Sequence, residues 1–453
     1  MLTNFRAGPT NRLGSPQRNN GPHGQYLLRS HKPGSLLRVD SPRVAQVTQW
    51  FPPEPEGPEF WVAEQLAKRG IRPVIVTANP NYPTGRVYDG YQATGRIRES
   101  YRGFTVQRCP VFPSRDSSAL KRFATYGSFA ASSSWFGRRI LASADVTFVY
   151  SSPAPAASAA IAARVLHGTP YVLWVQDLWP DTIFATGFLQ DGPLRRAAEW
   201  TVGGFTQTAY RLASHIAVIT PGMRDLLIQR GVPGEKVSVV YNWVDESVMR
   251  PVPPIGTMRH DLGIPDHDIV LMYAGGHGLA QRLQSWVTAL AQVRDLPDLH
   301  LVFVGDGPEK AGLVELATSL DLRNAHFLPR VDRREVVQLI AESDAQVISL
   351  ADDPLFDITL PSKTQSSLAC AKPIVASLRG DLAEILRRAQ AGWVAEPENP
   401  ESIAGVMRMA HETGREGLRR MGVRGRDYYL KNMSEDAGGA ALAAIVREAA
   451  AKG

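Results

Sequence analysis

The chain has 453 residues, 44% of them hydrophobic and 21% charged, which is typical of a folded globular protein too long for a single compact core. Its formal net charge of +6 arises within residues 1–39, where six arginines and lysines precede the first acid, Asp40. The remainder has equal numbers of acidic and basic residues, and this balance argues against a nucleic-acid-binding protein.

Residues 1–40 are predicted to form a disordered basic tail, because they are rich in Gly, Pro, Asn and Arg and poor in apolar clusters. The tail lacks the apolar core of a secretory signal, and no apolar run in the chain approaches the roughly 18 residues that span a bilayer. Cys109 and Cys370 are too few and too far apart for a disulfide framework. We therefore expect a cytoplasmic protein, and the basic tail leaves open a peripheral contact with anionic lipid at the inner face of the cell membrane.

From residue 41 onward, short apolar runs alternate with longer segments of helical spacing. The first half contains the predicted strands "RVAQVTQWF", "RPVIVTAN", "GFTVQRCPV", "DVTFVYSS", "PYVLWVQD", "SHIAVITP" and "KVSVVYNW". After a proline-rich stretch at 251–254 the alternation begins again, with "DIVLMYAGG", "LHLVFVGDG", "AHFLPRV", "DAQVISL", "KPIVAS" and "AGWVAEP". Because parallel neighbours need crossover connections, this alternation predicts parallel sheets covered by helices.

We therefore predict an α/β protein with two doubly wound, Rossmann-like domains that face each other across a cleft. The first is expected over 41–250 and the second over 251–430. A helical segment over 431–453 follows, for which packing back on the first domain is one possible arrangement. Ligands of open parallel sheets bind beyond the carboxyl ends of the strands, so chemistry is expected in the loops there.

The loop "YAGGHGLAQRLQSW" follows the first strand of the second domain. Gly276 and Gly278 allow close approach of the backbone to a ligand, and the helix start behind them suits a phosphate. His277 is a candidate donor to phosphate oxygens, although single loop histidines are more often incidental. Gln281 occupies the third glycine position of the dinucleotide fingerprint, which argues against a nicotinamide enzyme. A purely structural turn explains the loop about equally well.

The segment "DITLPSKTQSS" contains a lysine without a neighbouring acid. Pro361 and Ser362 are expected to begin and cap a short helix, which places Lys363 near its N-terminus. A cation there opposes the helix dipole, so local stability does not explain it, whereas an anionic ligand does. A tolerated surface lysine is the alternative.

Asp177, in "WVQDLWPD", follows a buried strand of the first domain and is a candidate catalytic residue that faces the cleft. A carboxylate that only caps a loop is the equally weighted alternative. The sequence contains no carboxylate-rich cluster, so a metal site is not expected.

Taken together, these stretches resemble the retaining glycosyltransferases of the GT-B fold, group 1 or family 4, and among them the enzymes of bacterial surface polysaccharide of the fucosamine and colanic-acid type. The segments that carry the resemblance are "WFPPEPEG", "NPNYPTGRVYDGY", "QDLWPD", "TPGMRDLLIQRGVPGEKVSVVYNWVD", "YAGGHGLAQ", "VFVGDGPEK" and "DDPLFDITLPSK".

The resemblance implies an N-terminal acceptor domain, a C-terminal nucleotide-sugar domain, and transfer from a UDP-sugar to a glycan or polyprenyl-linked acceptor. It implies no metal and no cofactor besides the nucleotide-sugar co-substrate. Asp177 would lie beside the reacting sugar. The implied acceptor-side residues are Gly57, Asn81 and Tyr82. The implied donor-binding residues are Gly276, His277, Gly278, Gln281, Arg282, Ser362, Lys363, Gln365 and Ser366.

The chain departs from the family pattern "PSKLFEYMAAGKP" with "PSKTQSSLACAKP". Ser366 replaces the acid that holds the ribose, Ala371 replaces a glycine, and Arg282 stands where the family usually has glycine. Loss of the carboxylate should weaken donor binding by roughly 1.5–3 kcal/mol, part of which Arg282 could return through the diphosphate. A catalytically degenerate partner or scaffold, or a nucleotide-sugar epimerase of the same fold, are the alternatives.

Overall fold

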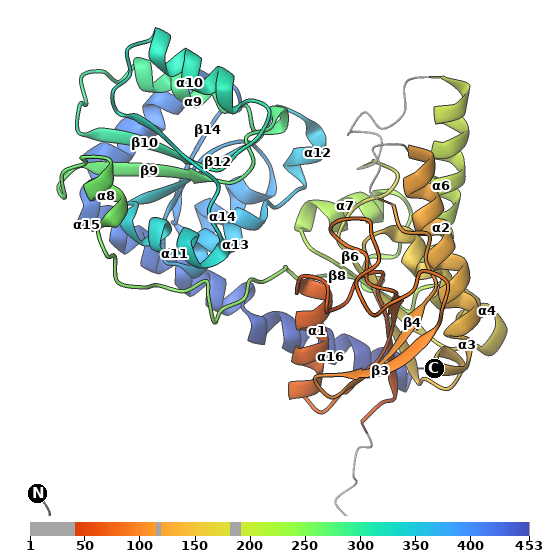
Figure 1. Cartoon of the computed structure of the whole chain (residues 1–453). Coiled ribbons are helices and arrows are strands. Elements are labelled where there is room, and N and C mark those ends of the chain that lie inside the picture. The colour runs from red at the N-terminus through yellow and green to blue at the C-terminus, as the bar shows by residue number, and fades with distance from the viewer. Residues whose placement is uncertain (1–40, 115–118, 182–191, 453) are drawn as a thin grey trace, which may run out of the picture. The chain divides into compact units, whose positions relative to one another are not determined.

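The computed structural model describes residues 41–114, 119–181 and 192–452. The predicted disordered tail over 1–40 lies outside these ranges. The strands of the described residues form two separate sheets, one from each half of the chain (Figure 1).

The first sheet has eight strands in the order β3-β4-β2-β1-β5-β6-β7-β8. The order places the first strand near the middle, where the chain reverses its winding direction between β1 and β5. The strands are β1 (Val44–Val47), β2 (Val74–Ala78), β3 (Ile97–Tyr101), β4 (Phe104–Cys109), β5 (Val146–Ser151), β6 (Tyr171–Val175), β7 (His215–Val218) and β8 (Val237–Val239).

Strand β3 is the exception to the predicted parallel sheet, because it pairs with β4 in antiparallel orientation at the sheet edge. Its side chains alternate between half-buried and exposed, so it has no continuous apolar run that would have marked it as a strand. The hairpin turn consists of Arg102 and Gly103, both with positive φ, which matches the tight turn preferred by two-residue hairpins.

Helices and short 3-10 turns connect the strands of the first sheet. Apolar residues of these helices and of alternate strand positions meet in two clusters, one of which surrounds Phe51 and Phe60. The helical elements are α1 (Pro58–Lys68), α2 (Ala119–Phe136), α3 (Arg138–Ala142), η1 (Ala154–Ala157), α4 (Ser158–His167), α6 (Pro193–Leu212), α7 (Pro221–Gln229) and η2 (Gly234–Lys236).

The second sheet has six parallel strands in the order β11-β10-β9-β12-β13-β14. Both faces are covered: Val270 and Met272 of its first strand enter one apolar cluster, while Leu271 and Tyr273 enter the other. This explains the unbroken apolar run in the sequence. The strands are β9 (Ile269–Ala274), β10 (Leu299–Val304), β11 (Ala325–Leu328), β12 (Ala345–Ser349), β13 (Ile374–Ser377) and β14 (Gly392–Ala395).

The helical elements of the second sheet alternate with its strands, as the sequence predicts. Their bounds are α8 (Thr257–Asp261), η3 (Leu279–Gln281), α9 (Gln284–Ala291), α10 (Lys310–Ser319), α11 (Arg333–Glu342), α12 (Pro354–Asp357), α13 (Ser362–Ala369) and α14 (Asp381–Ala389).

Two helices end the chain. Helix α15 (Pro400–Asn432) packs on α9 and α13 of the second half and has non-helical backbone at Gly414. Helix α16 (Glu435–Ala451) lies beside α1, and the Gln65 amide donates to the Glu435 carboxylate at 2.8 Å (Figure 1). Leu442 and Val446 of α16 belong to the core of the first sheet. The last helix is therefore an integral part of the first half of the fold.

None of the described helices has the length and apolar character that a bilayer crossing requires.

Candidate active site

The glycine loop after β9 lies directly against Lys363. A Cβ atom added to Gly275 would be 2.5 Å from the Lys363 Cε atom and 2.8 Å from its Nζ atom. The ammonium also lies 4.8 Å from the centroid of the Tyr273 ring, whose hydroxyl donates to the Gly276 carbonyl at 2.7 Å. The loop and the lysine, which are far apart in the sequence, thus form one site at the carboxyl end of the sheet.

Lys363 carries a charge that the described residues do not neutralise. Burial lowers the pKa of its ammonium, and no carboxylate of the described chain forms an ion pair with it. A buried cation without a partner is unfavourable, and a bound anion would remove that penalty. This environment favours an anion-binding role over a tolerated surface lysine.

A second glycine turn supports the loop from behind. Gly305 and Gly307, in the turn after β10, have positive φ and leave no room for a Cβ atom against the backbone of Gly275 and His277. The His277 backbone N–H donates to the Asp306 carbonyl at 2.9 Å. The "GDG" turn therefore holds the shape of the loop.

His277 is fully buried between aromatic rings. Its imidazole lies edge-on to Phe303 and tilted against Tyr273. Burial lowers the pKa of the ring, and neither ring nitrogen has a hydrogen-bond partner among the described residues. Buried polar atoms are usually satisfied, so the two unpaired nitrogens of this ring are exceptions to that rule, and the ring does not line the cavity beside the loop.

The rest of the loop is held by its own side chains. The Gln281 amide oxygen accepts from the Gly278 N–H at 3.1 Å. The Arg282 guanidinium pairs with Glu398, from the loop after β14, with Nε 3.4 Å from the carboxylate. In this structure Arg282 therefore has a carboxylate partner, which its position in the sequence did not indicate.

Helix α13 presents its first turn to the loop, but two predicted ligand groups bond within the helix. Gln365 is buried, and with its nitrogen as donor the amide bonds to the carbonyls of Pro361 and Ser362. The Ser366 hydroxyl donates to the Ser362 carbonyl at 3.3 Å. The expectation that Ser362 caps the helix is wrong: Pro361 occupies the cap position, and no side-chain cap is formed.

Ala371, at the end of this helix, adopts the left-handed conformation with φ of 56°. This conformation strains a residue that has a Cβ atom by about 1–2 kcal/mol, whereas glycine adopts it freely. Because glycine also adds entropy to the unfolded chain, we expect Ala371→Gly to raise the free energy of unfolding by only about 0.5–1 kcal/mol. Urea denaturation measures this change, and Ala383→Gly within α14 is the control, which should destabilise. A loss of stability in Ala371→Gly would contradict the strained conformation.

A cavity of about 470 Å³ opens beside the glycine loop, at the carboxyl ends of β9, β10 and β11. Arg330 and Arg333 from the segment after β11 lie in its wall, and Asp306 contributes from the supporting turn. These residues were not predicted as site residues, although "LPRVDRREV" follows a predicted strand and therefore indicates a loop at the binding edge of the sheet.

Asp177 lies in a second cavity of about 630 Å³, at the carboxyl end of β6. Its Oδ2 atom accepts from the Ser152 hydroxyl at 2.9 Å, and burial raises the pKa of the carboxyl group. Trp50 and Tyr126 line the same cavity, together with Leu355 from the second half of the chain. Asp177 is therefore a half-buried carboxylate that lines a cavity and accepts one hydrogen bond from a neighbouring loop.

Asn81 and Tyr82 line a smaller cavity of about 250 Å³, which shares Trp50 and Tyr126 with the Asp177 cavity. The buried Glu54 carboxylate fixes their loop, because its Oε1 atom accepts from the backbone N–H groups of Asn81 and Tyr82 at 2.8 and 2.7 Å. Burial raises the pKa of Glu54 to about 6. The role of Glu54 could not be predicted from the sequence, because the N–H groups that it binds lie in a separate loop.

Gly57 precedes α1 and lines neither of these cavities. A Cβ atom there would be 2.7 Å from the carboxylate of Glu59, so the glycine makes room for that buried side chain. Burial raises the pKa of Glu59 to about 7. Gly57 therefore has a local packing role in this structure.

The raised pKa of Glu59 predicts a pH-dependent stability. The folded state binds this proton more tightly than the unfolded chain, so stability is lost as the pH rises from about 4.5 to about 7. We expect Glu59→Gln to raise the free energy of unfolding by about 1–2 kcal/mol at pH 8 and to leave it nearly unchanged at pH 5. Urea denaturation at both pH values checks this, and an equal effect at both would contradict it.

Among the described residues, no group of histidine, cysteine, aspartate and glutamate side chains is arranged to hold a metal ion.

Two family models match the chain. A glycosyl transferase 4-like domain matches residues 61–243, and the model described as glycosyl transferases group 1 matches residues 255–427. The curated protein WcaI of Escherichia coli (strain K12), whose name places it among colanic acid biosynthesis glycosyl transferases, is 28% identical over 77% of this chain and 86% of its own length.

Solved structures agree in fold. HepE of Anabaena in complex with UDP and glucose superposes with a TM-score of 0.61 at 17% identity, covering 90% of this chain and 99% of that chain. Sucrose-phosphate synthase from Thermosynechococcus elongatus has a TM-score of 0.66 at 14% identity, covering 91% and 100%. HepE has also been solved with UDP-glucose, at a TM-score of 0.62, 17% identity and coverage of 90% and 100%.

Proposed function

We propose that this chain, which belongs to the group 1 glycosyltransferases and has their GT-B fold, transfers a sugar from a UDP-linked donor to a glycan or lipid-linked acceptor with retention of configuration. The observation that carries the donor assignment is the half-buried ammonium of Lys363, which lies against the glycine loop and forms no ion pair with a described carboxylate.

The donor diphosphate would bind between Lys363 and the loop at Gly276–Gly278. Lys363 would supply positive charge for the leaving diphosphate, and the fully buried His277 would have to move before a ring nitrogen could donate to it. Such groups lower the barrier by stabilising charge that develops on the leaving group. Catalysis in this arrangement rests mainly on positioning and electrostatics.

The nucleoside would occupy the 470 Å³ cavity beside the loop, which lies within the size range of small-molecule sites. The crystal structures of HepE with UDP and with UDP-glucose support UDP as the nucleotide. At the ribose, Ser366 would offer a neutral hydroxyl in place of the family's acid. We therefore expect only modest donor affinity.

The acceptor would enter through the cavity that holds Asp177. The Ser152 hydroxyl orients this carboxylate, and Asp177 would face the transferred sugar or the attacking hydroxyl. Asn81 and Tyr82 would contact more distant parts of the acceptor through the adjoining cavity. The similarity to WcaI supports a surface-polysaccharide acceptor.

A thermal-shift screen tests the donor class. UDP and UDP-sugars should raise the melting temperature by a few degrees at concentrations well above Kd, because they bind only the folded protein. GDP and GDP-sugars are the matched comparison and should shift it less. A larger shift with GDP compounds would overturn the UDP assignment, and no shift with any nucleotide would overturn the donor site itself.

A further inference from the structure

A cavity of about 670 Å³ lies in the second half of the chain, apart from the proposed donor site. It is bounded by Ser343 and Asp344, just before β12, and by the residues just before β13, so it lies at the amino ends of these strands. The donor site lies at the carboxyl ends of the sheet. The two cavities share no lining residue.

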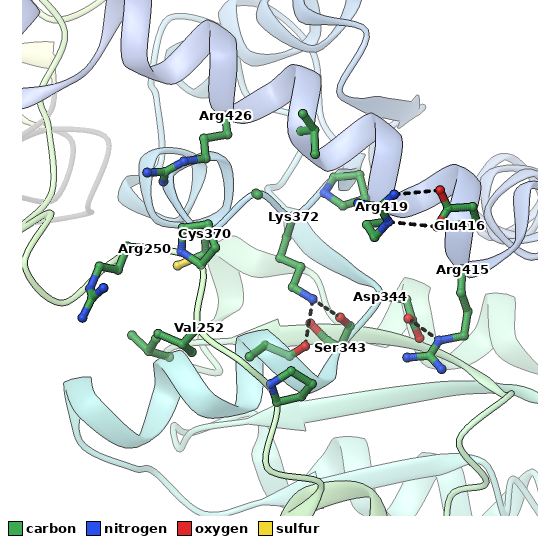
Figure 2. A pocket seen from close by; sticks show the side chains of 17 residues that line it. Arg250, Val252, Ser343, Asp344, Cys370, Lys372, Arg415, Glu416, Arg419 and Arg426 are labelled. Atoms are coloured by element: carbon green, nitrogen blue, oxygen red, sulfur yellow. Dashed lines mark hydrogen bonds and ion pairs between the residues drawn. The ribbon is translucent and has the colours of Figure 1, made fainter.

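Among the charged residues that line this cavity, five are basic and two are acidic (Figure 2). Three arginines come from α15, one from the linker at 250–254, and a lysine reaches in from the turn before β13. The charged lining residues are Arg250, Lys372, Arg415, Arg419 and Arg426 on the basic side and Asp344 and Glu416 on the acidic side.

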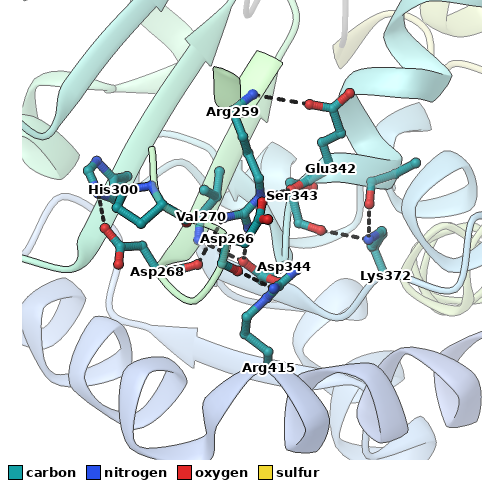
Figure 3. Close-up of polar contacts among 12 residues, drawn as sticks. Arg259, Asp266, Asp268, Val270, His300, Glu342, Ser343, Asp344, Lys372 and Arg415 are labelled. Atoms are coloured by element: carbon teal, nitrogen blue, oxygen red, sulfur yellow. Dashed lines mark hydrogen bonds and ion pairs between the residues drawn. The ribbon is translucent and has the colours of Figure 1, made fainter. Parts of the chain in front are cut away.

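The two acids are already engaged. Asp344 accepts from the buried guanidinium of Arg259 at 2.7 Å and from Arg415 Nε at 2.8 Å (Figure 3). The Asp344 carboxylate therefore pairs with two guanidinium groups, of which only Arg415 lines the cavity. Glu416 forms two hydrogen bonds of 2.8 Å with Arg419, one turn further along α15.

Three cations of the cavity have only neutral partners. The Lys372 ammonium donates to the carbonyls of Ala341 and Ser343 at 2.9 and 2.6 Å. Arg250 donates to the Ser247 carbonyl and Arg426 to the Ala369 carbonyl. Across the described ranges of the chain, none of the three forms an ion pair with a carboxylate. Burial lowers the pKa of Lys372 to about 8, although the nearby Asp344 carboxylate partly opposes this effect.

We propose that this cavity binds a soluble, phosphate-bearing small molecule. Guanidinium groups match pairs of phosphate oxygens, and an ammonium supplies a further charged hydrogen bond. Arg250 and Arg419 would approach the anion from opposite walls, while Lys372 would reach it from the floor. The volume suits a ligand between a diphosphate and a nucleotide in size.

The walls of the cavity also suggest what such a ligand would do. The linker at 250–254 and helix α15 belong to the two segments by which the chain passes between its two sheets. An anion held between them would tie these segments together. The site is therefore suited to an effector that adjusts the enzyme, since the donor and acceptor cavities lie elsewhere.

Pyrophosphate binding, measured by calorimetry, tests the proposal. The wild-type chain should bind pyrophosphate at the donor site and at this cavity, so Lys363→Met serves as the background that weakens only the first. In that background the double variant Arg250→Gln with Arg419→Gln should weaken the remaining binding by about tenfold or more, as expected for lost charged hydrogen bonds. These arginines are exposed, so the fold should tolerate both changes.

The matched control is Arg387→Gln with Arg323→Gln, which removes two exposed arginines that do not line the cavity. Arg387 pairs with Glu384 at the same helical spacing as Arg419 with Glu416. The control should change affinity less than about twofold. The proposal is overturned if the Lys363→Met protein binds no pyrophosphate, or if both double variants weaken binding equally. It is also overturned if the cavity variant loses binding to phosphatidylglycerol vesicles while pyrophosphate binding is unchanged.

Discussion

Replacing Lys363 by methionine is expected to weaken UDP binding by roughly a hundredfold while the fold remains intact. Methionine keeps most of the length of the side chain, so the contacts of the lysine stem with the glycine loop are largely preserved. The substitution removes the ammonium, whose pKa is lowered by burial, and with it the charged hydrogen bonds that we propose it makes to the diphosphate. Calorimetric titration with UDP measures the loss.

The melting temperature of the Lys363→Met protein without nucleotide is the accompanying control. It should stay the same or rise slightly, because an uncompensated buried charge is replaced by an apolar group. Unchanged UDP affinity in a folded variant would remove Lys363 from the donor site. A lower melting temperature together with weaker binding would instead indicate a structural role.

Replacing Ser366 by glutamate is expected to tighten UDP binding by up to about a hundredfold. Residue 366 lies one helical turn after Lys363 and is only partly buried, so a longer side chain can extend from α13 without displacing core residues. A carboxylate there could accept a hydrogen bond from each ribose hydroxyl through two charged oxygens, whereas the serine offers one neutral oxygen. Binding should also acquire a pH dependence near pH 4–5, where a carboxylate titrates.

Ser362→Glu is the matched control for the added charge. It places a carboxylate on the same helix near Lys363, but at its exposed start, and it should not tighten UDP binding. If both glutamate variants change UDP affinity equally, the change is caused by the added negative charge and not by a contact with the ribose. If Ser366→Glu binds UDP no better than wild type, α13 does not approach the ribose as the family resemblance implies.

The two parallel sheets could be predicted because their strands are buried on both faces and therefore appear as continuous apolar runs. The contact between Lys363 and the glycine loop could also be predicted, because both follow strands whose carboxyl ends share one edge of a sheet. Strand β3 was missed because only one of its faces is covered and its charged residues resemble a loop.

The sequence did not predict which side chains form ion pairs or hydrogen bonds with groups far away along the chain. The ion pair of Arg282 with Glu398 joins loops after different strands, and nothing in either segment indicates the other. The same holds for Glu54, whose carboxylate fixes the loop at Asn81. Such contacts depend on how the chain folds around its sheets, which a local pattern does not specify.

Two departures from the family pattern lie at positions with an unusual backbone conformation, which the sequence alone does not reveal. Arg282 and Ala371 replace glycines of that pattern, and both adopt positive φ, at 47° and 56°. The backbone thus keeps the conformation that glycine would allow, although each substituted residue is strained there. The ion pair of Arg282 offers some compensation for this strain, whereas Ala371 has no comparable polar contact through its methyl group.

Helix α16 has a consequence for the biogenesis of the protein. Leu442 and Val446 complete the core of the sheet that residues near Val44 begin, so the opening strands emerge from the ribosome long before the helix that covers them. While the second half is being translated, the first half lacks part of its apolar cover. The nascent chain is therefore exposed to aggregation during this interval, and the first half can reach its final packing only after α16 has left the ribosome.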